Sequence, residues 1–302
     1  MPTQFRTERA SLRVPATSAN LGPGFDAFGL AVSLYDDVAV RVTDSGLSVT
    51  IAGEGSDLPT DESHLVVRAM RAAFGRLGGQ PPGLALTCTN RVPHGRGLGS
   101  SAAAIVAGVV LARDLVVDGD QRLSDADLLA LATEIEGHPD NVAACLLGGF
   151  TVAWTDEQAG ARAVRLDVDP AIAPIAFVPP FEASTAMARG LLPATVPHAD
   201  AAFAAGRAAL LVAALTGHPA LLLPATEDRL HQSYRTPAMP ESAALVAALR
   251  DAGVPAVVSG AGPTVLALRA TDEQADAAQR LAPEGWDVQW LSVSVHGATP
   301  GH

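Results

Sequence analysis

Hydrophobic and polar positions follow two different periods along the first half of the chain. Apolar runs rich in strand-forming residues cover Leu30 to Val42 and Leu47 to Ala52. A stretch from near Glu62 to Leu77 instead carries apolar residues at helical spacing, which predicts an amphipathic helix. Strand and helix patterns that alternate in this way favour an α/β or α+β organisation.

A second helix in this half is marked by its start signal. Ser124 is placed to act as the N-cap, and Asp127 three residues later makes a variant of the capping box. Leu128, Leu131 and Ile135 then fall on one face of the predicted helix. The helix leads directly into the polar segment Glu134-Ile-Glu-Gly-His-Pro-Asp-Asn141.

The second half opens after a stretch without clear period, between Trp154 and Pro180, where a β-like run covers only Ile175 to Val178. We therefore expect two lobes, residues 1–160 and 161–302. An alanine- and leucine-rich pattern predicts one helix over about 199–215, and a second is predicted over 241–252, ended by Gly253. A short strand over 256–259 precedes a glycine-rich turn.

Composition narrows the class of protein. The chain has 302 residues, of which 48% are hydrophobic, so it can bury a sizeable core shared by two lobes with a cleft between them. The longest apolar stretches, 102–112 and 208–215, are shorter than the roughly 18 to 20 residues that a membrane helix needs. The amino terminus has no apolar signal-peptide core. We expect a cytoplasmic protein without a membrane partner.

Charge and cysteine content exclude further classes. The 32 acidic residues outnumber the 20 basic ones, giving a net charge of -12, which disfavours nucleic acid as a partner. Cys88 and Cys145 are far apart, so neither a disulfide framework nor a zinc site is expected. Every basic residue is arginine, and the absence of lysine excludes a Walker-type phosphate loop and a Schiff-base enzyme.

One segment has the pattern of a phosphate-binding loop that opens a helix. Its three glycines allow the backbone to approach an oxyanion closely, and the free amides and dipole of the following helix favour negative charge. Ser100 and Ser101 add hydroxyls that can contact a phosphate or a metal ion. A plain glycine turn capped by serine is the alternative. The segment comprises Pro93, His94, Gly95, Arg96, Gly97, Leu98, Gly99, Ser100, Ser101, Ala102 and Ala103.

This segment resembles the ATP-binding signature of the GHMP kinases, a superfamily of small-molecule kinases. Two further segments resemble its other motifs: the run from Val14 to Leu30, in the form found in homoserine kinases, and Ser259-Gly-Ala-Gly-Pro-Thr-Val265. The segments Ser184 to Pro193 and Glu227 to Arg235 also resemble those of homoserine kinases. The resemblance implies a two-lobed α+β fold with a ribosomal-S5-domain-2-like first lobe, a ferredoxin-like second lobe and the active site in the cleft.

The resemblance also assigns roles. It implies ATP on the glycine loop and an amino-acid substrate, L-homoserine, held by its amino-acid end. For Mg²⁺ it favours Ser101 with Glu134, and Glu136 is the second choice. Asp140 is the nearest candidate for a base, and Asn141 is placed to orient the reacting hydroxyl. The substrate-binding residues that it implies are Asn20, Asp26, His138, Arg189 and Arg235.

The sequence leaves several points open. Another GHMP kinase, acting on mevalonate or a sugar, is the alternative enzyme, although the segments that carry Arg189 and Arg235 count against it. A catalytically silent binding protein of the same fold is the alternative from another class. A homodimer is among the oligomeric states left open. Relatives often carry asparagine where this chain has His64, near the expected adenine pocket.

Overall fold

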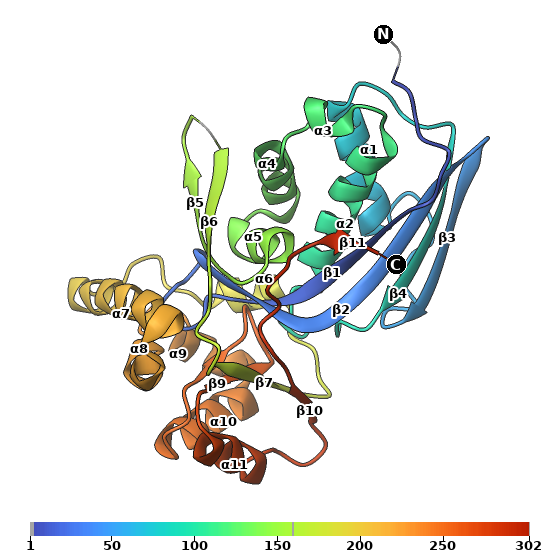
Figure 1. Cartoon of the computed structure of the whole chain (residues 1–302). Helices are drawn as coiled ribbons and strands as arrows, with labels where there is room; N and C mark the ends of the chain where they lie inside the picture. Colours follow the sequence, from blue (N-terminus) through green and yellow to red (C-terminus); the bar gives the residue numbers. More distant parts are fainter. Residues whose placement is uncertain (1–2, 159, 302) are drawn as a thin grey trace.

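The structure is a computed structural model that describes residues 3–158 and 160–301, and it shows two lobes (Figure 1). The first lobe is built on a seven-stranded sheet in the order β11-β1-β2-β4-β3, with β5 paired to β2 and β6 paired to β5. All these pairs are antiparallel except β3 with β4. The strands are β1 Ala10–Ala19, β2 Phe28–Thr43, β3 Gly46–Gly53, β4 Gly83–Asn90, β5 Phe150–Asp156, β6 Gly160–Leu166 and β11 Thr299–Pro300.

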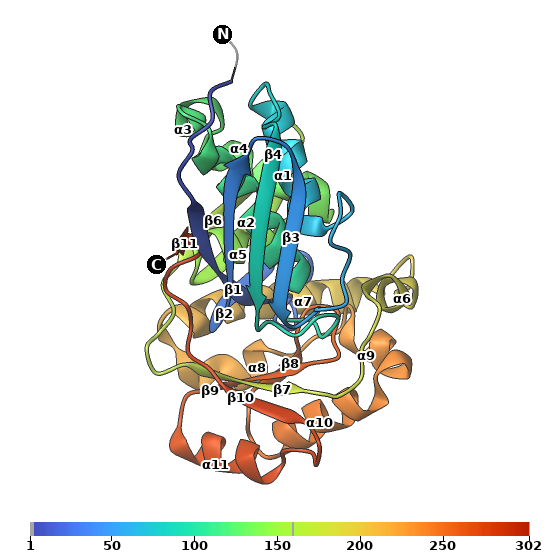
Figure 2. The same ribbon diagram turned by 90° about the vertical axis from the view of Figure 1, so that its right-hand side faces the viewer.

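Helices cover one face of this sheet. Figure 2 looks onto the opposite face, with α2 and α5 behind the strands. The capping box predicted at Ser124 is present, because its hydroxyl accepts the Asp127 amide and the Asp127 carboxylate accepts the Ser124 amide. The helices are α1 Leu65–Arg76, α2 Ser100–Leu115, α3 Gly119–Arg122, α4 Asp125–Glu136 and α5 Pro139–Leu147.

The second lobe holds a four-stranded antiparallel sheet in the order β10-β7-β9-β8, formed by β7 Ala173–Val178, β8 Ala256–Val258, β9 Val265–Arg269 and β10 Asp287–Trp290. Strand β7 alternates between two cores: Ile175 and Phe177 pack against α10 and α11, whereas Ala176 and Val178 share a core with α7, α8 and the first lobe. The helices are α6 Thr185–Gly190, α7 His198–Gly217, α8 Leu222–Ala225, α9 Gln232–Arg235, α10 Pro240–Asp251 and α11 Asp272–Arg280. The predicted two-lobed α+β class is confirmed.

The chain passes between the lobes more than once. The boundary expected at residue 160 falls on the first residue of β6, which still belongs to the first sheet, and the second sheet begins with β7. Near the other end the chain returns, since Val293 bridges to Val32 and β11 pairs with the edge of β1. The first sheet therefore takes strands from both ends of the chain.

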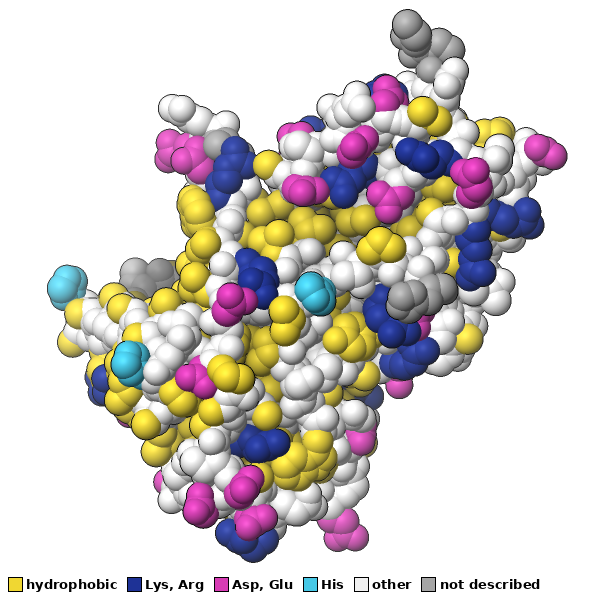
Figure 3. All heavy atoms as spheres, viewed as in Figure 1, with side chains coloured by type: hydrophobic (Ala, Val, Ile, Leu, Met, Phe, Trp, Pro, Cys, Tyr) yellow, Lys and Arg dark blue, Asp and Glu magenta, His cyan; other side chains and the backbone are white. Residues whose placement is uncertain are grey.

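Helix α7 is longer than the pattern of apolar residues indicated. It spans 20 residues with a mean hydropathy of 1.4, and in the described part of the chain it is the one helix long and apolar enough to cross a membrane by length and composition alone. A single helix of this kind is weak evidence for a membrane span, and 22% of its apolar window is buried inside the protein. Figure 3 shows hydrophobic side chains on the face around α7 and the β5–β6 hairpin.

Candidate active site

A polar cavity of about 210 Å³ lies where the two lobes meet. Most of the residues singled out in the sequence line it, although they come from segments more than 200 residues apart. Glu136, the second choice for the metal, also lines it. Ala19, Ala183, Thr185 and the turn Gly260–Gly262 complete the lining, and the sequence did not assign these residues individually. The predicted residues in the lining are Asn20, Asp26, Gly95, Gly97, Gly99, Ser100, Ser101, His138, Asp140, Asn141, Arg189 and Arg235.

The predicted phosphate loop runs along one side of this cavity and opens α2. Gly97 and Gly99 have φ values of +79° and +70°, which side chains rarely adopt. A Cβ atom on Gly99 would lie 2.0 Å from Thr17 Oγ1, and one on Gly97 would lie 2.4 Å from the Ser259 carbonyl oxygen. Both positions therefore require glycine. Loops that bring their backbone close to a ligand have the same requirement.

The turn after β8 supports this loop from behind. Ser259 Oγ donates to the Gly97 carbonyl oxygen at 2.6 Å, and the Thr264 amide donates to the Arg96 carbonyl oxygen at 3.1 Å. The Arg96 side chain points away from the cavity, where it donates to the carbonyl oxygens of Pro179 and Pro180 and pairs with Glu182. Arg96 therefore joins the loop to the second lobe. Pro93, Leu98, Ala102 and Ala103 also lie outside the cavity lining.

The carboxylate beside the loop serine is Glu136. Ser101 Oγ donates to Glu136 Oε1 at 2.6 Å, and burial raises the pKa of this carboxyl above its ordinary value. Glu134, which the sequence favoured, lies elsewhere: it forms a surface ion pair with Arg76 at 2.8 Å. Residues two apart on a helix point in different directions, so the end of α4 can aim only one of the two glutamates at the loop.

His138, Asp140 and Asn141 form a connected group at the start of α5. His138 Nδ1 lies 2.6 Å from Asp140 Oδ1, and this contact raises the pKa of His138. The same Asp140 oxygen accepts a hydrogen bond from the backbone N–H of Asn141 at 2.6 Å. Thr17 Oγ1 donates to Asn141 Oδ1 at 2.9 Å, so the side-chain oxygen of Asn141 is used within the protein.

The Asn20 side chain is used within the protein. It is buried, its Oδ1 accepts the Asp26 amide at 2.9 Å, and its Nδ2 donates to the Gly260 carbonyl oxygen at 2.9 Å. Asn20 and Asp26 both have positive φ values, of 69° and 54°. Asn20 thus fixes a strained turn that presents Asp26 to the cavity.

Two arginines line the same cavity as Asp26, and they differ in their partners. Arg189 forms a two-pronged ion pair with Asp26, with nitrogen–oxygen distances of 2.7 and 3.1 Å. Arg235 is almost fully buried, and in the described part of the chain no carboxylate lies within ion-pair distance of it. It donates to the Gly260 carbonyl oxygen at 3.0 Å, and its Nε has no hydrogen-bond partner. The buried Arg235 charge therefore lacks a counter-ion.

His231, which the sequence did not single out as a site residue, holds Arg235 in place. Burial lowers the pKa of His231, so its ring is neutral near pH 7. Its Nε2 lies 2.8 Å from the Gly22 carbonyl oxygen and therefore carries the proton, which leaves Nδ1 to accept from Arg235 at 3.3 Å.

The chain matches the sequence profile of the GHMP kinases N terminal domain over residues 64–149 and that of the GHMP kinases C terminal over residues 201–287. The chain belongs to the GHMP kinases. It is 64% identical to the homoserine kinases of Streptomyces avermitilis and Streptomyces coelicolor, in each case over 98% of this chain and at least 95% of the relative. The crystal structure of homoserine kinase from Cytophaga hutchinsonii superimposes with a TM-score of 0.83, at 30% identity and 98% coverage of both chains.

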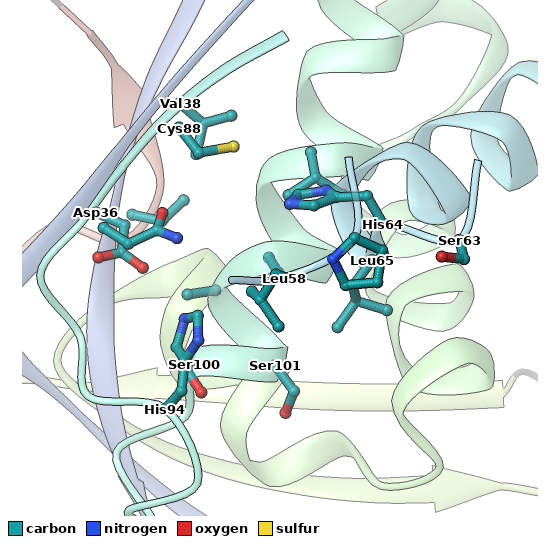
Figure 4. Close-up of a pocket in the computed structure, with 16 residues that line it drawn as sticks. Asp36, Val38, Leu58, Ser63, His64, Leu65, Cys88, His94, Ser100 and Ser101 are labelled. Carbon is teal, nitrogen blue, oxygen red and sulfur yellow. The ribbon is translucent and has the colours of Figure 1, made fainter. Parts of the chain in front are cut away.

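This GHMP kinase has a second cavity, of about 260 Å³, which adjoins the first because Ser100 and Ser101 line both (Figure 4). Its walls are mostly apolar, with Val38 and Cys88 on the strand side. Burial raises the pKa of the Cys88 thiol to about 12, so this sulfur is neutral and behaves as an apolar wall. A flat ring with a few polar edges fits such a lining.

His64 projects into this second cavity from the start of α1, as Figure 4 shows. The residue is 5% exposed, and its Nδ1 has no hydrogen-bond partner in the described part of the chain. Burial lowers the pKa of His64, which favours the neutral ring. A buried polar atom without a partner costs about 1 to 3 kcal/mol, so this nitrogen favours a ligand that can bond to it.

Proposed function

We propose that the chain transfers the γ-phosphoryl group of ATP to the side-chain hydroxyl of L-homoserine, giving O-phospho-L-homoserine. We place this reaction in threonine biosynthesis in the cytoplasm. One observation carries the proposal: a single cavity joins the glycine loop at the start of α2 to a carboxylate and two arginines. The homoserine kinases reported above, at 64% identity over nearly their whole length, support the same substrate.

The charges at the far end of the cavity suit an α-amino acid. Among the described residues Arg235 has no anionic partner, and a guanidinium is well suited to hold a carboxylate through two parallel hydrogen bonds. When the substrate binds, Asp26 can give up one of its contacts with Arg189 and pair with the substrate ammonium. Arg189 can then pair with the substrate carboxylate. The substrate zwitterion thus takes the place of an existing ion pair, so little charge is left uncompensated.

The rest of the cavity supplies alignment. Transfer of a phosphoryl group requires mainly that the hydroxyl and the γ-phosphorus be held in line and that spreading charge be neutralised. In this assignment the phosphates would lie against the loop amides and the start of α2, which line the cavity, and the side-chain nitrogen of Asn141 would donate to the hydroxyl. Because Asp140 already contacts His138 and the Asn141 amide, we assign it the task of positioning these two residues.

We further propose that Ser101 and Glu136 would hold the Mg²⁺ ion that accompanies ATP. Two oxygen donors lie side by side there, and Mg²⁺ in kinases usually takes one or two protein oxygens with phosphates and water as its other ligands. The described residues contain no cluster of three or more metal-binding side chains, which fits a site that the nucleotide completes. When bound, the ion neutralises charge on the phosphates.

Substitution of Glu136 tests the metal assignment. Glu136→Gln is expected to raise the Mg²⁺ concentration for half-maximal rate about tenfold or more, because it removes a charged oxygen ligand, while the KM for homoserine changes little. Glu134→Gln is the matched control, since it changes the same group two residues away on the exposed surface. An equal Mg²⁺ requirement in the two variants would remove Glu136 from the site.

We assign the second cavity to the adenine base, with His64 at its edge. Adenine offers a donor at N6 beside an acceptor at N7, so either neutral tautomer of His64 finds a partner. His64→Leu is expected to raise the KM for ATP about 2- to 10-fold and to reduce the preference for ATP over GTP, with little change in kcat. Ser63→Ala, in the same wall, is the control. Unchanged KM and nucleotide preference in His64→Leu would place the base elsewhere.

A single assay separates the proposed activity from its alternatives. ADP release is measured with homoserine, mevalonate and galactose in parallel, at equal enzyme and ATP concentrations. Turnover with homoserine alone is the expected result. Turnover with mevalonate or galactose instead would support another GHMP kinase, and nucleotide binding without any turnover would support a silent binding protein.

A further inference from the structure

Two adjacent aspartates in β2 have opposite surroundings. Successive side chains of a strand point to opposite faces of the sheet, so Asp36 and Asp37 lie on different faces. Asp37 pairs with Arg13 and Arg91, each at 2.8 Å. Asp36 is only 5% exposed and, with Val38, lines the second cavity described above. An ionisable group buried beside apolar side chains is costly unless its oxygens have partners, so the partners of Asp36 need to be identified.

Only one of the two carboxylate oxygens of Asp36 is used within the protein. Its Oδ1 accepts hydrogen bonds from the backbone N–H groups of Arg91 and Val92, at 2.6 and 2.9 Å. In the described part of the chain no hydrogen bond reaches Oδ2, and no cationic side chain lies within ion-pair distance of it. Burial raises the pKa of Asp36, and the two N–H bonds and the nearby His94 offset only part of this rise. The second oxygen therefore favours a ligand that can donate a hydrogen bond.

The position of Asp36 suits contact with a nucleotide base. Figure 4 shows Asp36 and His64 on opposite sides of the cavity, with Val38 and Cys88 on the strand side. A flat ring bound between them would meet a polar group at each of two edges and apolar side chains elsewhere. Asp36 offers an acceptor at one edge, and the uncompensated nitrogen of His64 lies at the other.

We propose that Asp36 Oδ2 accepts a hydrogen bond from the N6 amino group of adenine and so selects ATP over GTP. Adenine carries a donor at this position, whereas guanine carries the acceptor O6. A carboxylate attracts the first and repels the second. The amino group has two hydrogens, so a contact with His64 leaves the other one for Asp36. This inference rests on the assignment of the cavity to the base made above.

The free oxygen of Asp36 also argues against the opposite preference. Guanine has two adjacent donors, at N1 and N2, and a carboxylate with both oxygens free can hold them together. Asp36 has no such pair to offer, because Oδ1 already accepts two backbone N–H groups and an oxygen has only two lone pairs. One free acceptor matches the single amino group of adenine.

Asp36→Asn tests the proposal by replacing the free acceptor with a donor. The asparagine oxygen can keep both backbone bonds, so its amide nitrogen takes the place of Oδ2. We expect the dissociation constant for ATP to rise at least tenfold while GTP binds as well as before or more tightly. Both are measured calorimetrically on the full chain without homoserine. Asp37→Asn makes the same change on the other face of the sheet and should leave both constants unchanged.

An altered nucleotide supplies an independent probe. Purine riboside triphosphate has a hydrogen in place of the N6 amino group and otherwise matches ATP. The unmodified chain is expected to bind it at least tenfold more weakly than ATP, and Asp36→Asn is expected to bind ATP no more tightly than the analogue. His64→Leu separates the two edges of the base. Discrimination that persists in His64→Leu belongs to Asp36, and discrimination that is lost there belongs to His64.

Each outcome decides the proposal. If Asp36→Asn keeps the unmodified preference for ATP over GTP, or if the unmodified chain binds ATP and the analogue equally, Asp36 does not read the base. Circular dichroism checks the fold of the variant, and where Asp36→Asn does not fold, the analogue measured on the unmodified chain and on His64→Leu decides. The expected nucleotide pattern without any phosphorylation of homoserine would uphold the role of Asp36 and contradict the proposed function.

Discussion

Arg235→Met is expected to lower kcat/KM for L-homoserine by roughly 30-fold to several thousand-fold while nucleotide binding, measured alone, changes little. A carboxylate held by a guanidinium in a closed site leaves an unpaired charge when one partner is deleted, which typically costs about 2 to 5 kcal/mol. Methionine keeps most of the side-chain volume, so the decrease in kcat/KM can be attributed to removal of the positive charge. The measurement is steady-state kinetics with a separate nucleotide titration.

Homoserine amide supplies the control for this prediction. It lacks the carboxylate, so it should be a poor substrate of the unmodified enzyme. Arg235→Met should lower kcat/KM for the amide little further, because the interaction between Arg235 and the carboxylate is already absent. The variant should also remain folded, since no carboxylate in the described part of the chain pairs with Arg235. If Arg235→Met loses activity equally on homoserine and on the amide, the arginine acts on phosphate or on folding. The same test applies to Arg189→Met.

Gly99→Ala is expected to weaken ATP binding by about 100-fold or more and to abolish measurable turnover. An alanine at φ +70° is strained by about 1 to 2 kcal/mol, and its Cβ would lie 2.0 Å from Thr17 Oγ1. Thr17 or the loop must then move, which displaces the amides that face the phosphates and the hydroxyl that orients Asn141. Nucleotide titration and circular dichroism measured together separate this loss from unfolding.

Gly75→Ala is the matched control for the loop variant. Gly75 lies in α1, and a Cβ atom there would meet no atom of the described residues within 4 Å. The control should bind ATP normally and be more stable by about 0.5 to 1 kcal/mol, because alanine favours a helix. Normal ATP affinity in Gly99→Ala would contradict the assignment of the segment as the phosphate loop.

Long periodic segments of this fold were predictable from the sequence. The strand expected from Leu30 is β2, and the helices expected over 199–215 and 241–252 are α7 and α10, because long runs of strand-forming or helix-forming residues can be recognised without knowledge of tertiary contacts. The β5–β6 hairpin was missed. Its outer face leaves Trp154 and Val164 exposed, so the strands lack the regular alternation of apolar and polar residues that marks a half-buried sheet.

The parts of the site in which a sequence motif fixes the backbone were predictable. The parts in which the role of a residue depends on the direction of its side chain were less so. Which glutamate faces Ser101 depends on where α4 ends and how its last turn is oriented, and the motif spacing left both Glu134 and Glu136 open. Helical phase offers a signal: Glu136 lies four residues after the buried Ala132, on the face that turns inward. The role of Asn20 within its turn and that of His231 behind Arg235 depend on tertiary contacts that no local pattern specifies.

The return of the chain to β1 has a consequence for synthesis on the ribosome. At Leu12 and Arg13 the outer edge of β1 is paired with β11, whose residues emerge about 280 residues after those of β1. Until then a growing chain that has already built most of its first lobe carries an unpaired strand edge, the kind of surface on which other chains can add. Residues 293–300 thus complete the first lobe only at the end of synthesis. A fragment that ends at Leu166 should therefore be prone to aggregate, although it contains nearly all of the core residues of the first lobe.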